Sequence, residues 1–175
     1  ASSIELKNNI KILDISSGSG DIALLLLERA KKQNIKISVT ISDFNIDMLA
    51  VAKSRKDLVK HTNNINFLHL DACLMTKNTK ENKYNNEIHK KYDFDYIEEN
   101  TYDIITCSFG VRNFYNIQQG ISEIYRSLKH NGSFFCLEFS PINDGLFNKA
   151  YNFYSNKIIP NIGHLIVKDI ESYQY

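Results

Sequence analysis

Polar side chains with hydrogen-bonding chemistry stand at or just after the ends of four apolar runs in this chain. Asp14 lies at the end of the first run, Asp43 follows the second, Asp71 and Ala72 follow the third, and Ser108 closes the fourth. These runs are short and rich in branched residues, which is typical of buried parallel strands. In an open parallel sheet, ligands bind outside the carboxyl ends of the strands. Four consecutive strand ends of this kind therefore predict a ligand site at that edge of the sheet.

A glycine loop follows the first apolar run. Gly18, Ser19 and Gly20 stand just before a leucine-rich segment that predicts a helix. With Asp43 about twenty residues further on, this spacing matches the fingerprint of a nicotinamide dinucleotide site. The same loop is also compatible with a plain turn between strand and helix that binds nothing. The loop alone leaves the identity of the ligand open.

Three features favour S-adenosyl-L-methionine over a dinucleotide. Asp14 stands just before the loop, where its negative charge would repel a pyrophosphate and attract the ammonium of a methionine moiety. Asp71 and Ala72 supply an acceptor and a small side chain where an adenine could lie, and Met48 offers that ring a deformable apolar contact. We expect S-adenosyl-L-methionine as the cofactor and S-adenosyl-L-homocysteine as its product. A nicotinamide-dependent oxidoreductase is the alternative.

Strands that alternate with helices position these groups. The predicted strands span residues 10–15, 36–41, 65–70, 102–108 and 134–139. The predicted helices are residues 21–34, a segment capped by Asn45, and a segment opened by the capping-box pair Asn116 and Gln119. This alternation predicts an α/β fold that is Rossmann-like, with a parallel sheet and helices on both faces.

The last predicted helix carries an apolar stripe at helical spacing. Its members are Ile117, Ile121, Ile124, Tyr125 and Leu128. Such a stripe predicts the face that packs against the sheet. Gly132 suits the left-handed position past the end of this helix.

The composition bounds the class of protein. The 175 residues carry a net charge of +1, so no basic surplus indicates a nucleic-acid partner. The cysteines Cys73, Cys107 and Cys136 lack metal-ligand spacing, which predicts buried free thiols and no metal. No run of about 18 apolar residues occurs, so the sequence predicts no membrane-spanning segment.

Two segments depart from the alternation of strands and helices. Residues 77–100 are rich in Lys, Asn, Glu and Tyr with little apolar periodicity, which predicts a low-complexity surface insertion. Residues 141–175 are aromatic and amphipathic, and Tyr154 is one of several apolar or aromatic positions there at helical spacing. This pattern fits ordinary core packing.

Several longer segments are distinctive. They are Ile12-Leu-Asp-Ile-Ser-Ser-Gly-Ser-Gly-Asp21, Ser42-Asp-Phe-Asn-Ile-Asp-Met-Leu49, Thr106-Cys-Ser-Phe-Gly-Val-Arg-Asn113, Ile124-Tyr-Arg-Ser-Leu-Lys129, Cys136-Leu-Glu-Phe-Ser140, Ile159-Pro and Asp169-Ile-Glu-Ser-Tyr-Gln-Tyr175. On these segments the chain resembles the ubiquinone/menaquinone-biosynthesis C-methyltransferase family. The resemblance covers nearly the whole chain apart from residues 77–100.

The resemblance implies a class I S-adenosylmethionine-dependent methyltransferase fold and a set of cofactor contacts. Carried over residue by residue, these contacts fall on Ser19, Asp43, Asp71, Ala72 and Ser108. Ser17 stands where the family usually has glycine, which adds a side chain to a loop that needs tight backbone turns.

The resemblance also assigns a catalytic part to Arg112 and implies substrate contacts at Asn113 and Tyr154. A guanidinium is almost never neutral, so we expect its fixed charge to stabilise a developing phenolate and to orient a water that accepts the proton. The alternative for Arg112 is a structural ion pair with Asp169 or Glu138.

The expected function is C-methylation of the ring of a polyprenylated benzoquinol in ubiquinone biosynthesis. The alternatives are a demethylmenaquinol methylase, a non-catalytic subunit of a quinone-biosynthesis complex, and the oxidoreductase named above. Besides the prenylated quinol, the expected partners are such a complex, a second copy of the chain, and a membrane surface contacted peripherally.

The family's domain extends beyond this chain, with an N-terminal helical segment and two further C-terminal strands. We therefore expect residues 1–175 to be a partial methyltransferase domain, truncated at both ends, with residues 141–175 as the lid of the substrate pocket. The Cys136 to Ser140 segment is similar to the mitochondrial branch. That branch implies the matrix face of the inner membrane, with a targeting segment outside this chain, or the cytoplasm if the protein is bacterial.

Overall fold

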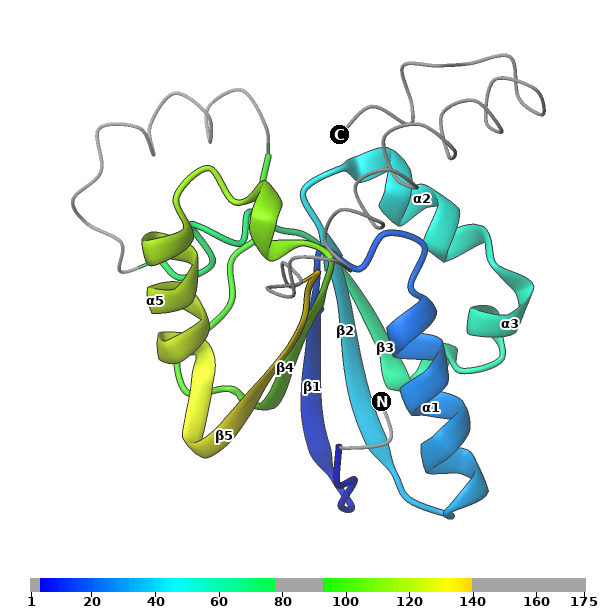
Figure 1. Cartoon of the computed structure of the whole chain (residues 1–175). Coiled ribbons are helices and arrows are strands. Elements are labelled where there is room, and N and C mark those ends of the chain that lie inside the picture. Colours follow the sequence, from blue (N-terminus) through cyan, green and yellow to red (C-terminus); the bar gives the residue numbers. More distant parts are fainter. Residues whose placement is uncertain (1–3, 78–92, 140–175) are drawn as a thin grey trace, which may run out of the picture. The chain divides into compact units, whose positions relative to one another are not determined.

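The sheet at the centre of the molecule has five strands in the order β3-β2-β1-β4-β5, and every neighbouring pair is parallel (Figure 1). The computed structural model describes residues 4–77 and 93–139. The strands are β1 (Ile10–Ile15), β2 (Ile37–Asp43), β3 (Ile65–His69), β4 (Tyr102–Ser108) and β5 (Leu128–Leu137). The chain order reverses between β1 and β4, which is the point where ligands bind in open α/β sheets. The predicted parallel sheet is confirmed.

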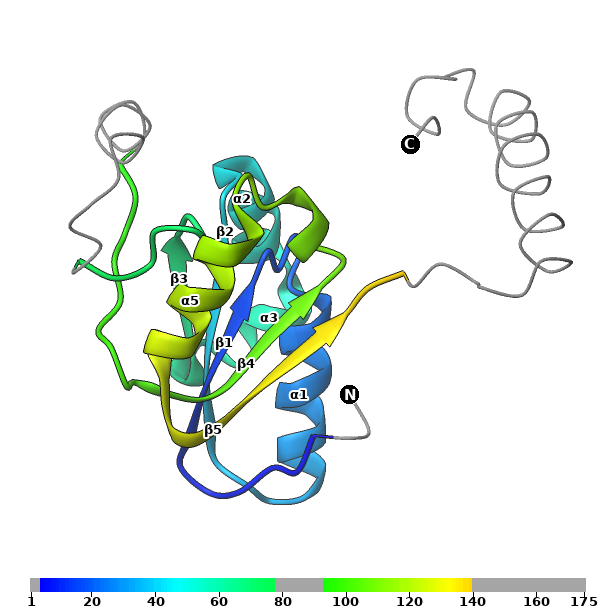
Figure 2. The same ribbon diagram turned by 60° about the vertical axis from the view of Figure 1, so that its left-hand side comes forward.

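Helices cover both faces of the sheet, as predicted (Figures 1 and 2). The helices α1 (Asp21–Lys32), α2 (Ile46–Ser54) and α3 (Lys56–Val59) lie on one face, and α5 (Ile117–Ser127) lies on the other. Two short 3₁₀ turns complete the described elements, η1 (Thr62–Asn64) and η2 (Val111–Asn113). Because side chains alternate along a strand, Ile12 packs into the core under α1 while its neighbour Leu13 packs into the core under α5.

The ends of α1 and α2 follow from local chemistry. Asp21 lies in the first turn of α1 and Lys32 in its last, which matches the polarity of the helix dipole. The helix ends two residues earlier than predicted, and Asn34 adopts a left-handed conformation with φ of 54°. The predicted cap of α2 is confirmed, since Asn45 Oδ1 accepts a hydrogen bond of 2.9 Å from the Asp47 backbone N–H.

Helix α5 begins as predicted but turns a different face to the core. Asn116 Oδ1 accepts a hydrogen bond of 3.0 Å from the Gln119 backbone N–H. Of the predicted stripe, Ile124 is buried, whereas the exposed members are Ile117, Ile121 and Tyr125. The buried side includes Glu123 and Ser127 instead. The stripe prediction is therefore wrong for most of its members.

The end of α5 also differs from the prediction. Strand β5 begins at Leu128, directly after the helix, and its regular pairing with β4 runs from Ser133 to Leu137. The left-handed position falls on Asn131, with φ of 63°. Gly132 is required by a close approach, because a Cβ there would lie 2.9 Å from the Lys129 carbonyl oxygen.

The predicted surface insertion does not hold for its last residues. Phe94 and Ile97 are only 6% and 7% exposed, and the Ile97 N–H donates a hydrogen bond of 2.9 Å to the Met75 carbonyl. Ile97 belongs to the core under α5, and the Phe94 ring packs on His69 at the end of β3. Residues 78–92, and the predicted lid 141–175 with Tyr154, lie outside the described residues.

Three further sequence predictions concern thiols, metals and membranes. Cys73 and Cys107 are buried free thiols as predicted, whereas Cys136 on β5 is exposed. Within residues 4–77 and 93–139, no group of three or more His, Cys, Asp or Glu is placed to hold a metal ion. None of the helices in that part of the chain combines the length and the apolar character that crossing a bilayer requires.

Candidate functional site

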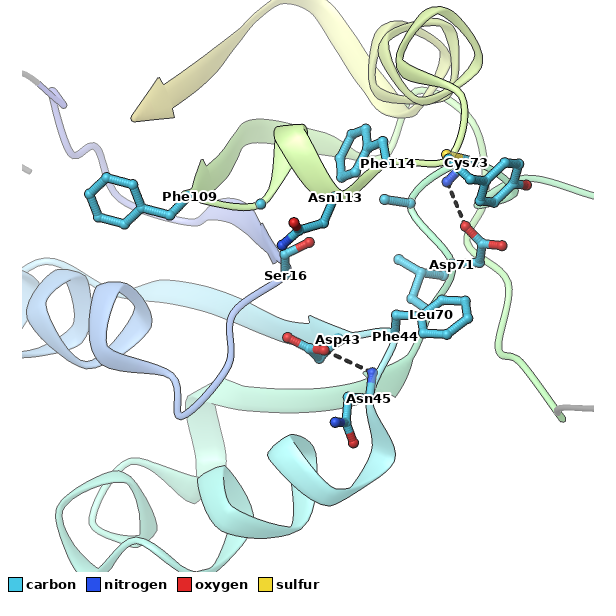
Figure 3. A pocket seen from close by; sticks show the side chains of 13 residues that line it. Ser16, Asp43, Phe44, Asn45, Leu70, Asp71, Cys73, Phe109, Asn113 and Phe114 are labelled. Atoms are coloured by element: carbon cyan, nitrogen blue, oxygen red, sulfur yellow. Dashed lines mark hydrogen bonds between the residues drawn. The ribbon is translucent and has the colours of Figure 1, made fainter. Parts of the chain in front are cut away.

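A pocket of about 430 Å³ opens at the carboxyl ends of β1, β2, β3 and β4 (Figure 3). This is the edge of the sheet that the sequence predicts. Its lining residues are Ser16, Asp43, Phe44, Asn45, Leu70, Asp71, Ala72, Cys73, Phe109, Gly110, Asn113, Phe114 and Tyr115. The combination of aromatic walls with a few carboxylate and amide groups is typical of a small-molecule site.

Asp43 joins the pocket to the glycine loop. Its Oδ2 accepts a hydrogen bond of 2.8 Å from the Gly18 backbone N–H, and its Oδ1 accepts one of 2.8 Å from the Asn45 backbone N–H. Each carboxylate oxygen has a second lone pair, and Asp43 itself lines the pocket. The side chain is therefore fixed from behind and keeps acceptor capacity for a ligand.

The glycine loop accommodates the serine that replaces a family glycine. The left-handed backbone positions in the loop are Ser16, Gly18 and Gly20, with φ of 52°, 55° and 80°. Ser17 lies between them, and its hydroxyl donates a hydrogen bond of 2.6 Å to the Asp14 carbonyl. Its side chain therefore takes a defined place in the loop at a position that does not demand glycine.

Asp14 lies buried under the loop instead of lining the pocket. Thr106 Oγ1 donates a hydrogen bond of 2.5 Å to its Oδ1, and its Oδ2 has no hydrogen-bond partner among the described residues. Burial raises the pKa of Asp14 to about 6, although the Thr106 hydrogen bond acts in the opposite direction. A negative charge held here would act on a ligand through space across the loop.

The turn after β4 forms the opposite wall. Gly110 is needed for a close approach, since a Cβ there would lie 2.5 Å from Ser16 Cβ and 2.8 Å from Cys107 Sγ. The next turn, η2, brings Asn113 into the pocket, where its side chain points toward Ser16 (Figure 3). Gly110 therefore allows the turn after β4 to lie directly against Ser16 of the glycine loop.

The loop after β3 forms the third side of the pocket. Asp71 Oδ1 accepts a hydrogen bond of 2.8 Å from the Cys73 backbone N–H (Figure 3). Burial, and then the neighbouring Asp71 carboxylate, raise the pKa of Tyr115. Burial also raises the pKa of Cys73 to about 11, so this thiol keeps its proton at neutral pH.

Arg112 lies in η2, at the rim. Its Nη1 is 3.9 Å from Glu138 Oε2, and its side chain is 52% exposed. The guanidinium carbon also lies 5.8 Å from the centre of the Phe109 ring. Of the two ion-pair partners that the sequence offers, Glu138 is therefore near, and Asp169 lies outside the described residues.

The structure places the predicted site residues in three groups. Four of them line the pocket: Asp43, Asp71, Ala72 and Asn113. Seven are not among its lining residues: Asp14, Gly18, Ser19, Gly20, Met48, Ser108 and Arg112. Tyr154 is not among the described residues. Four aromatic residues that line the pocket were not predicted: Phe44, Phe109, Phe114 and Tyr115. Their signal in the sequence is that each follows the end of β2 or β4 by at most seven positions.

Comparison with known proteins yields one family. The ubiE/COQ5 methyltransferase family matches residues 2–175. A protein of Rickettsia prowazekii named ubiquinone/menaquinone biosynthesis C-methyltransferase UbiE is 38% identical over 167 residues, which are 95% of this chain and 59% of that protein. The protein of the same name from Rickettsia felis is 36% identical over the same shares. The chain thus spans about three-fifths of the length of these relatives.

Solved structures with the same fold are more distant in sequence. The YcgJ protein of Bacillus subtilis has a TM-score of 0.59 and 21% identity, covering 90% of this chain and 55% of that one. A phosphoethanolamine N-methyltransferase of Haemonchus contortus has a TM-score of 0.55 and 22% identity, covering 85% and 29%. At these identities the likeness concerns the fold, which is the Rossmann-like fold of class I methyltransferases.

Proposed function

Because the chain belongs to the ubiE/COQ5 methyltransferase family, we propose that the whole protein methylates a ring carbon of a prenylated benzoquinol in ubiquinone biosynthesis, with S-adenosyl-L-methionine as methyl donor. The observation that carries this proposal is Asp43, whose carboxylate lines the pocket while it holds the glycine loop through the Gly18 N–H. The curated relatives are named for C-methylation in ubiquinone and menaquinone biosynthesis, so the demethylmenaquinol reaction is the second candidate.

The residues at the pocket fit this cofactor. Asp43 has acceptor capacity for two ribose hydroxyls, and Asp71 and Ala72 offer an acceptor and a small side chain on the next strand end. The pocket volume of about 430 Å³ lies within the usual range for small-molecule sites. The buried carboxylate of Asp14, with its unpartnered Oδ2, would favour a cationic group and disfavour a pyrophosphate at the glycine loop. The structure of the Haemonchus contortus N-methyltransferase, which has the same fold, was solved in complex with S-adenosylhomocysteine.

The cofactor supplies an electrophilic methyl group on a sulfonium. Methyl transfer to carbon then requires an electron-rich ring carbon held about 3 Å away and in line. The ring becomes nucleophilic when the adjacent hydroxyl loses its proton. Arg112 lies at the rim with its guanidinium half-exposed. We assign it the stabilisation of the phenolate, with a water as the proton acceptor.

The apolar walls suit a prenylated ring. Phe109 and Phe114 line the pocket on the β4 side and would exclude water from the reacting atoms. Asn113 can orient a quinol oxygen from the same wall. We propose that residues 141–175, with Tyr154, complete the substrate pocket as its lid.

The location and the partners follow from the proposed substrate. A prenylated quinol partitions into a bilayer, so we propose peripheral contact with a membrane surface. The relatives named above are bacterial, whereas the segment from Cys136 to Ser140 is similar to the mitochondrial branch. We propose the matrix face of the mitochondrial inner membrane, or the bacterial cytoplasm. Membership of a quinone-biosynthesis complex and a homodimer are part of the same proposal.

The first experiment separates the cofactor classes. Titration calorimetry of the full-length protein should show binding of S-adenosylhomocysteine and no binding of NADH. A short-chain benzoquinol and a short-chain demethylmenaquinol should then be offered with labelled S-adenosylmethionine. Methyl transfer to the benzoquinol supports the first candidate, and transfer to the demethylmenaquinol alone supports the second. NADH binding without S-adenosylhomocysteine binding would refute both, and binding without any turnover would favour a non-catalytic subunit.

A further inference from the structure

Glu123 is a carboxylate with no exposed surface, on the face of α5 that the apolar pattern does not predict to be buried. Its Oε2 accepts hydrogen bonds from the Thr76 backbone N–H at 2.7 Å and from Thr76 Oγ1 at 2.9 Å. Its Oε1 accepts a charge-assisted bond of 2.8 Å from Arg126 Nη1. A buried carboxylate is costly unless its oxygens are satisfied, and here each oxygen serves a different element. One oxygen holds the loop after β3, and the other holds the helix.

The loop that Glu123 holds is a wall of the pocket. Leu70, Asp71, Ala72 and Cys73 line the pocket, and Thr76 lies three residues after Cys73 in the same loop. Thr76 is also bridged to Ile97, so the loop is bound on both sides. The Glu123 contact therefore anchors the end of the segment that carries Asp71.

The helix that Glu123 belongs to continues the opposite wall. Asn113, Phe114 and Tyr115 line the pocket just before α5 begins. Figure 3 shows Asn113 and Phe114 on the η2 side and Asp71 on the β3 side. A second contact between the two walls lies at the start of the helix, where the Cys73 thiol donates a hydrogen bond of 3.4 Å to the Asn116 carbonyl.

These contacts tie the two walls together away from the pocket itself. Glu123 is not one of the lining residues, so a ligand there would not touch it. We infer that Glu123 is a positioning residue, which sets the separation of the Asp71 wall and the Phe114 wall through Thr76 and thereby the affinity for the nucleoside part of the cofactor. This inference rests on the proposed function.

The variants weaken the hydrogen bonds of Glu123, and they are chosen so that an effect on cofactor binding can be distinguished from a failure to fold. In Glu123→Gln one oxygen becomes an amide N–H₂, which cannot accept from Thr76 or from Arg126. Thr76→Val removes only the hydroxyl donor and keeps the shape, so it decides the outcome if Glu123→Gln fails to fold. Thr76→Ser keeps both donors and is the conservative rescue. Ser122→Ala is the matched control, because Ser122 lies next to Glu123 on α5 and its hydroxyl donates within the helix, to the Gln118 carbonyl.

The readout is S-adenosylhomocysteine affinity in the full-length protein by calorimetry, with thermal melts of each variant and kcat at saturating cofactor. We expect Thr76→Val to weaken binding by roughly 5-fold, within the range for loss of one hydrogen bond, and Glu123→Gln to weaken it further. Thr76→Ser and Ser122→Ala should bind like the parent. Kd unchanged in a folded Thr76→Val protein, whatever its melting temperature, would overturn the inference. Absence of binding to the parent protein would instead refute the proposed function.

Discussion

Asp43 Oδ2 and the Gly18 backbone N–H are joined by a hydrogen bond of 2.8 Å. One carboxylate therefore both lines the pocket and holds the glycine loop, and the end of β2 positions the loop after β1. The Asn45 N–H contact on Oδ1 adds the start of α2 to the same group. One side chain therefore contacts all three segments and also lines the pocket.

Replacing Asp43 should weaken the cofactor site and leave the fold intact. Asp43→Ala removes the acceptor for the ribose hydroxyls and for the Gly18 N–H, and we expect a loss of about 2 kcal/mol in S-adenosylhomocysteine binding. Asp43→Asn keeps one acceptor oxygen and should lose less. Calorimetry measures both, with Asp47→Asn on the exposed side of α2 as control. Equal affinity in Asp43→Ala and the parent would remove Asp43 from the site.

The buried carboxyl of Asp14 predicts a pH dependence of stability. Burial raises its pKa from 3.8 to about 6, so between these values the unfolded chain ionises while the folded protein keeps the proton. The folded state then binds more protons, and stability falls as pH rises through this window. At about 1.4 kcal/mol per pH unit, the loss is on the order of 3 kcal/mol, complete above the folded pKa.

Asp14→Asn isolates that effect, because an amide oxygen can still accept from Thr106 and the side chain no longer titrates. Urea unfolding from pH 4 to pH 7 should show the parent losing stability relative to the variant across the window. Below pH 4 the advantage in stability of the variant over the parent should be smallest. A constant difference at every pH would mean that Asp14 does not titrate in this range.

Much of the framework could be predicted because its signals are local. The runs Ile10–Ile15 and Tyr102–Ser108 are strands with the predicted bounds, since continuous apolar branched runs between polar turns permit few other structures. Asp43 and Asp71, which the sequence places at strand ends, both line the pocket, because parallel strands bring their carboxyl ends to one edge.

The face of α5 could not be predicted in the same way. Its apolar spacing marks Ile121 and Tyr125 for the core, yet they are 40% and 80% exposed while Glu123 has no exposed surface. On the buried face, Glu123 accepts hydrogen bonds from Thr76, a residue 47 positions away in the sequence. Periodicity records the spacing of a helix and carries no information about such a distant partner.

Phe94 should contribute strongly to stability, although it follows a segment with little apolar pattern. Its side chain is 6% exposed, and its ring centre lies 5.1 Å from that of Phe44 and 4.4 Å from that of His69. Phe94→Ala should cost about 3 kcal/mol, at the lower end for a buried phenylalanine. Tyr96→Ala, at a position 43% exposed, should cost clearly less. Similar urea midpoints for Phe94→Ala and the parent would contradict this packing.

Arg112 offers a test between catalysis and a structural ion pair. Its contact with Glu138 is 3.9 Å long and half-exposed, and such pairs contribute about 0–1 kcal/mol, so Arg112→Ala should melt close to the parent. If the guanidinium stabilises the phenolate, methyl transfer to a short-chain quinol should fall by roughly 100-fold or more. Arg112→Lys should retain part of the rate, and raising the pH should partly rescue Arg112→Ala, because hydroxide then ionises the quinol. Glu138→Gln removes the ion pair and is the control. Normal turnover in a folded Arg112→Ala protein would exclude the catalytic role.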